Sequence, residues 1–366
     1  MRELRALTGL RFVAAFYILI FHFYKRGLLP ELTLPLRNIV SQGALGVNMF
    51  FVLSGLLLTY SHLGEAQLRQ WPSGAEYRRF LAKRLARVYP VYVAGWAVTA
   101  LVVVMLNMQP ASFGWLLVLN LTLTHAWVPP LAMEWYGGGS WSVAVEMFFY
   151  LLFPLLLPWL LRVRQPRQLL GLLLILWALS CGPGLFFAKF PALPLFRWVY
   201  AFPPARLPEF VSGMVSGLLV FRQGWRVPSW VVAVAWLIAG AYLAQIGPRF
   251  EGYMAHNVLV LPALVLTVMH LAAPTRSPLA RLLATRLLHY LGRISYGFYI
   301  WQLALLMLID TLWHQHALRK ELPFSSFSTL GLILLTSVAS YHLLEEPARR
   351  FVLRRLRTAP PIEAPA

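Results

Sequence analysis

Charged residues are scarce in this chain: Asp, Glu, Lys and Arg make up 12% of its 366 residues, and only 13 residues are acidic. Hydrophobic residues make up 59%, more than a water-soluble domain carries. They gather in runs of about 15 to 20 residues, the length of a helix that crosses a hydrocarbon core of about 30 Å. The sequence therefore predicts an all-α integral membrane protein that lies in a lipid bilayer.

Cysteine is nearly absent, and histidine is scattered. Cys181 is the single cysteine, which excludes an intramolecular disulfide and a cysteine-based metal site. His125, His256, His270 and His342 do not have the spacing of metal ligands, so we expect no metal. A small-residue cleavage site is also missing after the first apolar run, so we interpret that run as a retained span rather than a signal peptide.

The net charge of +19 comes from Lys and Arg residues that lie in short clusters between the apolar runs. This placement is typical of proteins whose charges orient them in a membrane. We therefore expect no nucleic-acid partner.

Ten apolar runs are candidate spans, and an eleventh run, 113–128, is short and carries polar residues. If the eleventh run does not cross and the N-terminus is inside, 21 of the 32 Lys and Arg residues lie inside and nine outside. If it crosses, 14 lie inside and 16 outside. Because cytoplasmic loops carry the excess of Lys and Arg, we predict ten spans, cytoplasmic termini, and an outer region with a re-entrant or surface-lying segment at 107–141. The ten predicted spans are 7–24, 44–63, 88–106, 142–161, 169–188, 207–221, 229–246, 255–272, 287–309 and 326–344.

The chain shows no internal repeat and no polar segment long enough for a soluble domain. We interpret residues 1–357 as one membrane domain. The remaining stretch, 358–366, is rich in Pro and Ala, and we predict that it is a disordered tail.

Two ionisable residues interrupt the first span. Arg11 and His22 are eleven positions apart, which puts them on one helix face, about 16 Å apart along the axis. An ionisable side chain inside a span is costly and usually faces a protein or water cavity. A snorkelling Arg near one end and an interfacial His near the other would explain the same pattern, so both interpretations stay open.

Further charged residues lie near the ends of the predicted spans. His22, Glu146 and Glu209 lie towards the outer ends, whereas Arg84 and Arg87 lie at the cytoplasmic mouth. A neutral His beside a carboxylate can act as a general base. Structural roles compete with this hypothesis, namely positive-inside anchoring for the arginines and placement near a helix start for the two carboxylates.

Two other patterns predict the surroundings of the spans. Glu345 and Glu346 end the last span, where we expect them to be solvated. Gly43, Gly46 and Gly55 lie in or beside the second span and predict a close approach of another helix or a ligand.

Aromatic residues in the outer regions are candidates either for stacking on sugar rings or for the interfacial belt. We expect the glycine run 137–139 beside them to form a hinge. The aromatic candidates are Trp127, Trp135, Tyr136, Trp141, Trp198 and Tyr200.

Seven segments in this order resemble the acyltransferase-3 family of integral-membrane acyltransferases, and they extend over nearly the whole chain. The pair Arg11 and His22 matches the Arg and His of the family's first helix, and Arg84 and Arg87 match its Arg-x-x-Arg element. The segments are LRALTGLRFVAAFYILIFH (4–22), GVNMFFVLSGLLL (46–58), RRFLAKRLARVYPVY (78–92), WSVAVEMFFYLLFP (141–154), RLPEFVSGMVSG (206–217), LGRISYGFYIWQ (291–302) and EEPARR (345–350).

The resemblance implies acyl transfer from cytoplasmic acetyl-CoA to a hydroxyl, commonly on a cell-surface or exported carbohydrate, in the inner (plasma) membrane of a bacterium. Two positions differ from the family pattern: Asn48 stands where an acidic residue is frequent, and Gln302 where a His is frequent. We expect a stand-alone enzyme without the fused esterase-like domain of some members.

The residues and the resemblance together suggest one mechanism. Arg84, Arg87 and Arg11 hold the coenzyme A phosphates, and His22, oriented by Glu146 or Glu209, acts as general base or as an acyl relay. Two alternatives remain: an acyltransferase with a small or lipid-like acceptor, and a glycan transporter or exporter without acyl transfer.

Overall fold

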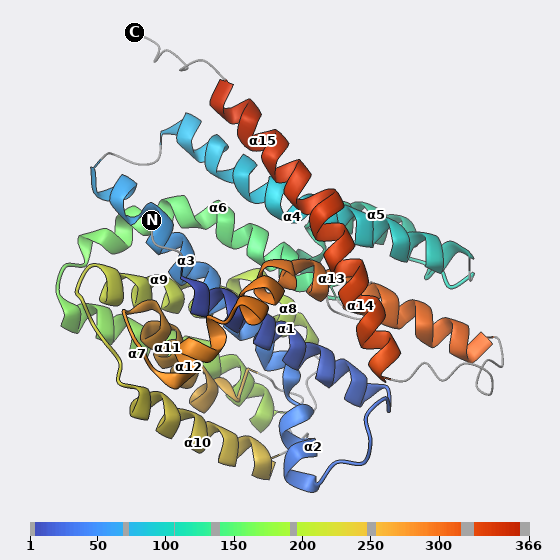
Figure 1. The fold of residues 1–366 in the computed structure, drawn as a ribbon, viewed down its shortest axis with the longest axis horizontal. Coiled ribbons are helices and arrows are strands. Elements are labelled where there is room, and N and C mark those ends of the chain that lie inside the picture. Colours follow the sequence, from blue (N-terminus) through green and yellow to red (C-terminus); the bar gives the residue numbers. More distant parts are fainter. Residues whose placement is uncertain are drawn as a thin grey trace.

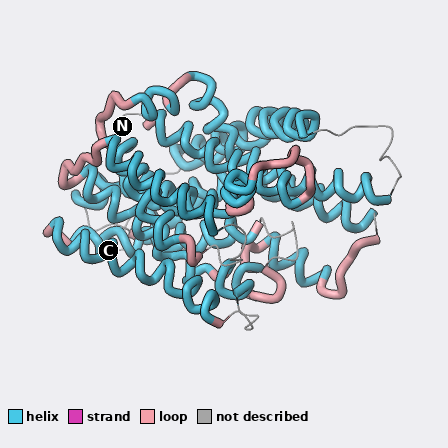
Figure 2. Tube along the Cα trace, turned by 90° about the horizontal axis from the view of Figure 1, so that it is seen from below, coloured by secondary structure: helices cyan, strands magenta, loops and turns pink. Residues whose placement is uncertain are grey.

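The computed structural model describes residues 4–68, 73–105, 107–132, 140–190, 196–246, 254–315 and 326–358. All regular secondary structure in these ranges is helical (Figure 1, Figure 2). The predicted glycine hinge at 137–139 lies outside the described residues, and so does the predicted tail apart from Thr358, the last residue of α15. The elements are α1 (Arg5–Lys25), α2 (Leu34–Val40), η1 (Gly43–Leu45), α3 (Gly46–Leu68), α4 (Gly74–Met105), α5 (Phe113–Leu121), η2 (His125–Trp127), α6 (Trp141–Arg162), α7 (Pro166–Lys189), α8 (Phe196–Ala201), η4 (Pro203–Arg206), α9 (Leu207–Phe221), α10 (Ser229–Ile246), α11 (Asn257–Ala272), α12 (Pro278–Leu283), α13 (Arg286–Gln315), α14 (Ser326–Ser340), η7 (Tyr341–Glu345) and α15 (Glu346–Thr358).

Each of the ten predicted spans coincides with a helix, but only eight helices in the described ranges are long and apolar enough to cross a membrane. The two shorter ones are α9, with 15 residues, and α11, with 16. At about 1.5 Å per residue they measure about 22 and 24 Å, less than a hydrocarbon core of about 30 Å. Both are buried along most of their length, so neighbouring helices rather than lipid surround them.

The apolar run at 113–128 forms the nine-residue helix α5, followed by a turn and the 3₁₀ helix η2. A helix of nine residues is about 13 Å long and cannot cross the bilayer. Leu123 adopts a positive φ of 58° where the chain turns after α5. The run therefore does not cross, as the count of Lys and Arg predicts.

Two helical segments extend beyond the predicted spans into basic sequence. Helix α4 has 32 residues and begins at Gly74, so the basic residues ahead of the predicted span 88–106 are also helical. Helix α14 continues through the π-helical turn η7 into α15. Figure 1 shows α15 running beside α4 at one end of the bundle. This pair carries many of the basic residues beyond the apolar core.

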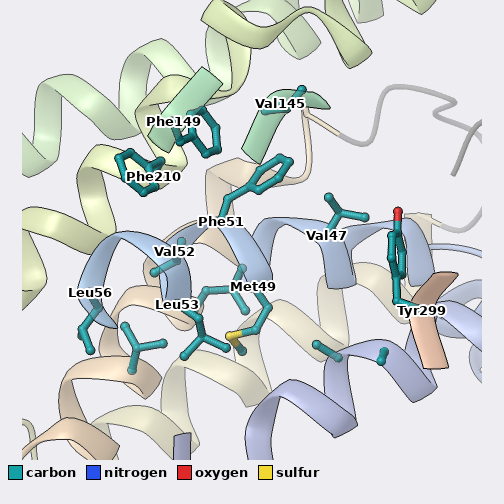
Figure 3. Packing of buried hydrophobic residues seen from close by; sticks show 14 of the residues in the cluster. Val47, Met49, Phe51, Val52, Leu53, Leu56, Val145, Phe149, Phe210 and Tyr299 are labelled. Atoms are coloured by element: carbon teal, nitrogen blue, oxygen red, sulfur yellow. The ribbon is translucent and has the colours of Figure 1, made fainter. Parts of the chain in front are cut away.

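Helix α3 packs most closely against α9 and α1, at the points where glycine replaces a side chain. A Cβ on Gly55 would lie 2.0 Å from the backbone oxygen of Phe210, and one on Gly213 would lie 2.0 Å from that of Val52. The prediction of close approach at Gly55 is confirmed, and so is that at Gly46, where a Cβ would lie 2.7 Å from a backbone oxygen of α1. Figure 3 shows side chains of α3, α6 and α9 filling the space around this contact.

Candidate active site

A cavity of about 620 Å³ runs between α1, α3, α4, α6, α13 and the η7–α15 turn. Its lining residues on α3 extend from Val47 to Ser61, which corresponds to about 21 Å along the helix. This depth is most of the thickness of a hydrocarbon core. The polar and charged lining residues are Thr8, Arg11, Ser54, Tyr60, Ser61, Arg84, Arg87, Ser142, Glu146, Tyr150, Arg293, Tyr296, Tyr299, Tyr341, Glu345, Glu346 and Arg349.

Four of the predicted site residues meet in this cavity. Arg11 comes from α1, Arg84 and Arg87 from consecutive turns of α4, and Glu146 from α6. Arg11 lies within electrostatic range of both Arg87 and Glu146. Of the two interpretations left open for Arg11, the structure agrees with a side chain that faces a protein cavity.

The carboxylate of Glu146 is held by two hydroxyl groups. Ser54 Oγ donates a hydrogen bond to Glu146 Oε1 at 3.2 Å, and Tyr150 OH donates to the same oxygen at 2.5 Å. Two donors on one oxygen fix the orientation of the side chain. Sequence reasoning missed both partners, although Tyr150 stands four residues after Glu146, on the same helix face.

Glu345 is buried, not solvated as the sequence predicted. Its side chain is 6% exposed and lines the cavity within electrostatic range of Arg11, Arg87 and Arg349. The π-helical turn η7 is the reason, because its wider turn changes which side chains of the last span face inwards. In the same turn Tyr341 accepts a hydrogen bond from Arg293 Nη2. The neighbouring Glu346 also lines the cavity, with its side chain 14% exposed, and it pairs with Arg349 and Arg350 of α15.

His22 does not line the cavity. His22 lies at the same depth along α1 as the 3₁₀ helix η1. Gly43 of η1 packs directly against this part of α1, because an added Cβ would be 2.4 Å from Phe21 Cβ and 2.6 Å from Tyr17 O. Helix α3 starts three residues later and runs away from this level, so His22 lies outward of Val47, the outermost cavity residue on α3. His22 shares a helix face with Arg11 and therefore lies above the outer end of the cavity.

Glu209 lies outside the cavity, in a fully buried polar cluster. Its Oε1 is 3.2 Å from Arg206 Nη2 and accepts a hydrogen bond from Asn257 Nδ2 at 3.1 Å. Asn48, one of the two departures from the family pattern, accepts a hydrogen bond from Arg206 and donates one to Asn257 Oδ1 at 2.6 Å. The cluster joins α3, η4, α9 and α11, and neither Glu209 nor Glu146 pairs with His22 among the described residues.

Arg206 is buried, although the sequence count placed it among the outer-loop cations. Its guanidinium lies 5.5 Å from the ring of Phe51, 5.8 Å from Trp141 and 5.3 Å from Tyr200. Trp141 and Tyr200 are each 3% exposed, so they are unavailable for stacking on a sugar. Trp127 is 42% exposed and remains a candidate. The other aromatic candidates, Trp135, Tyr136 and the side chain of Trp198, lie outside the described residues.

The helices long enough to cross a membrane, together with a charge-lined cavity between them, define a multi-pass membrane protein with an internal polar site. The chain belongs to the acyltransferase-3 family: residues 4–342 match the profile of its acyltransferase domain. It is an integral membrane acyltransferase.

Several known proteins are similar to this chain. It is 29% identical over 314 residues to the acyltransferase MdmB of Streptomyces mycarofaciens, which covers 81% of this chain and 78% of MdmB. It is 22% identical over 387 aligned positions to the putative O-acetyltransferase SACOL0978 of Staphylococcus aureus strain COL, which covers 98% of this chain and 59% of the relative. It is 24% identical over 383 positions to the O-acetyltransferase OatA of Staphylococcus aureus strain NCTC 8325, which covers 95% of this chain and 58% of OatA.

The chain thus spans less than two thirds of the length of the two staphylococcal relatives. No solved structure matches the chain.

Proposed function

We propose that this protein transfers an acetyl group from cytoplasmic acetyl-CoA to a hydroxyl of a cell-surface or exported carbohydrate. The observation that carries the proposal is the deep cavity, which brings Arg11, Arg84 and Arg87 together with Glu146. The names of the staphylococcal relatives, which are O-acetyltransferases, support the transfer of an acetyl group to oxygen.

The arginines are the proposed binding groups for the donor. Coenzyme A carries several phosphate charges, and guanidinium groups bind phosphate oxygens through paired hydrogen bonds. Arg84 and Arg87 lie on the part of α4 that precedes its apolar half, and Arg11 lies deeper. The pantetheine arm would extend along the cavity towards its outer end.

His22 is the proposed general base at the outer end. The acceptor hydroxyl gives its proton to the imidazole while its oxygen attacks the thioester carbon, and the imidazolium then protonates the departing thiolate. The thioester has to pass beyond Val47 to reach His22, because His22 lies outward of the lining residues. An acyl-histidine relay, in which the imidazole nitrogen itself attacks the thioester, is the second version of this step.

The two carboxylates have different proposed roles. Glu146 faces the cavity with Ser54 and Tyr150. It can therefore contact the pantetheine arm of the donor and offset the charge of Arg11. Glu209 is enclosed with Arg206, so we assign it a positioning role through the helices around α3.

The proposed location is the inner (plasma) membrane with both termini in the cytoplasm. The distribution of Lys and Arg supports this orientation, since it places α4 and α15 with their basic residues on the donor side. The second candidate for the acceptor is a small or lipid-like molecule. The burial of Trp141 and Tyr200 favours it, because these two rings were part of the case for a carbohydrate.

The test is acetyl-CoA turnover by the purified protein in detergent, with and without surface glycans of the producing cell. We expect His22→Ala to lower transfer by about 10² to 10⁴ in kcat, the usual contribution of a general base. His342→Ala is the control, because His342 is exposed and does not line the cavity. If neither donor turnover nor a His22 effect is seen, the protein is not the proposed enzyme and transport assays would follow.

The same assay tests the donor site. Arg87→Gln should raise KM for acetyl-CoA by about tenfold, the effect of losing one charge-assisted hydrogen bond of about 1.4 kcal/mol. Arg78→Gln, which changes an exposed arginine of α4 that does not line the cavity, should leave KM unchanged. Equal effects of the two substitutions would exclude the cavity as the donor site.

A further inference from the structure

Gln302 is a fully buried polar side chain without a hydrogen-bond partner. It lies on α13, its exposed fraction is 0%, and neither Oε1 nor Nε2 has a partner among the described residues. A buried amide that makes no hydrogen bond costs stability, since it has given up its bonds to water. A group kept at such a cost calls for an explanation, and a bound ligand is one.

The cavity ends on α13 close to Gln302. Tyr299, three residues earlier, lines the cavity and shares a hydrogen bond of 2.7 Å with Ser142 of α6. Figure 3 shows Tyr299 near Val47, and both residues line the cavity. One helical turn further along α13, Gln302 therefore lies just beyond the outer end of the cavity.

The packing of α13 on α1 places Gln302 relative to His22. Gly292 lies against Thr8, where a Cβ would be 2.0 Å from the backbone oxygen of Thr8. Further along, aromatic rings of the two helices pack 5.4 Å apart, so α1 and α13 run side by side in the same direction. Ten residues beyond Gly292, Gln302 is level with position 18 of α1, about one turn short of His22.

We propose that the side-chain amide of Gln302 binds the carbonyl group of the donor's thioester while His22 acts on the acceptor hydroxyl. The inference rests on the proposed function and names a further catalytic residue for it. The thioester must cross the interval between Val47 and His22. Gln302 lies at the depth of that interval, and its amide has no hydrogen-bond partner in the part of the chain that the structure describes.

The chemistry of the step favours a neutral N–H donor at this place. As the acceptor oxygen adds to the carbonyl carbon, the carbonyl π electrons move to oxygen, and the bond from Gln302 Nε2 strengthens with the growing charge. The electron pair then returns, the C–S bond breaks, and the thiolate takes the proton from His22. In surroundings that exclude water, such a donor is worth more than it would be in solution.

The test compares Gln302→Leu, which has a similar shape and no polar atoms, with wild type. We expect kcat for transfer to fall by about 10² to 10³, the effect of losing one oxyanion donor, while KM for acetyl-CoA stays within about threefold. The midpoint of thermal unfolding should stay the same or rise, because an unpaired buried amide is removed. Gln302→His, which can still present an N–H, should recover part of kcat.

Thr59→Val is the matched control. The Thr59 hydroxyl is also fully buried and has no partner among the described residues, but Thr59 does not line the cavity. This substitution should leave kcat unchanged. A Gln302→Leu protein with transfer within about threefold of wild type, or with a clearly lower unfolding midpoint, would overturn the inference and leave the proposed function standing. A wild-type protein without transfer would instead remove the proposed function itself, and the inference with it.

Discussion

At the scale of single residues, the two acidic sites, Glu146 in the cavity and Glu209 in the core, lead to different expectations for mutation. Glu146 lies in an open cavity with two hydroxyl partners. Glu209 is enclosed, and its loss would leave the guanidinium of Arg206 without its counter-charge.

We therefore expect Glu209→Gln to destabilise the protein by about 3–5 kcal/mol, the usual cost of removing one partner from a buried ion pair. The measurement is the midpoint of thermal or denaturant unfolding in detergent. Glu346→Gln is the control, since Glu346 pairs with exposed arginines and such pairs contribute about 0–1 kcal/mol. A Glu209→Gln protein of wild-type stability that has lost activity would instead support direct catalysis by Glu209.

Depth along each helix follows from position in an apolar run, so the sequence could place Arg84 and Arg87 at the inner end with Arg11 beyond them, and all three line the cavity. The same reasoning placed Glu146 beside His22, whereas the structure places it in the cavity with the arginines and not beside His22. The sequence was also not sufficient for Glu345. A π-helical turn shifts the facing of every residue after it, and no pattern in the sequence marked that turn. Contacts between helices, such as Ser54 with Glu146, are also invisible to periodicity alone.

At the scale of elements, the close contact between α3 and α9 depends on two glycines. A Cβ at Gly55 or Gly213 would lie 2.0 Å from a backbone oxygen of the other helix, so the helices would have to move apart. Since α3 supplies one whole side of the cavity, such a movement would also change the site.

Gly213→Ala should accordingly destabilise the protein by about 1–3 kcal/mol, the range for overpacking. Gly240→Ala on α10 should instead stabilise the protein. The new Cβ meets nothing within 4 Å there, and alanine is the better helix former by about 1 kcal/mol. Unfolding midpoints of the two variants, measured side by side, give the comparison. Equal shifts would mean that the α3–α9 contact does not limit stability.

The helices themselves were largely predictable from the sequence, because apolar runs and their polar ends are local properties. Whether each helix reaches both faces of the membrane was not predictable from the sequence. Helices α9 and α11 are as apolar as the others but shorter, and only their burial among neighbouring helices shows that they need not reach both faces.

At the scale of the whole molecule, the orientation in the membrane decides which end of the cavity receives the donor. Cys181 is buried and is the only cysteine, so single cysteines introduced elsewhere can be labelled against a low background. Gln109 lies in the predicted outer region, and Gln165 lies in a predicted cytoplasmic loop; both are exposed.

We expect Gln109→Cys to react with a membrane-impermeant maleimide in intact cells and Gln165→Cys to react only after permeabilisation. The measurement is labelling of the purified protein by mass. The reverse pattern would invert the orientation and place the arginine-lined end of the cavity outside the cell, where acetyl-CoA is not supplied.

Glu345 also bears on which cellular anions can bind at the arginine-lined end of the cavity. Glu345 lies within electrostatic range of Arg11, Arg87 and Arg349. When its carboxyl group is ionised, it weakens the attraction of these arginines for an ion that carries a single charge. A molecule with several phosphate charges engages several arginines at once and outweighs the repulsion from the carboxylate. If the arginines bind the donor as proposed, we expect chloride and small carboxylic acids to compete poorly with a donor that carries several phosphate charges.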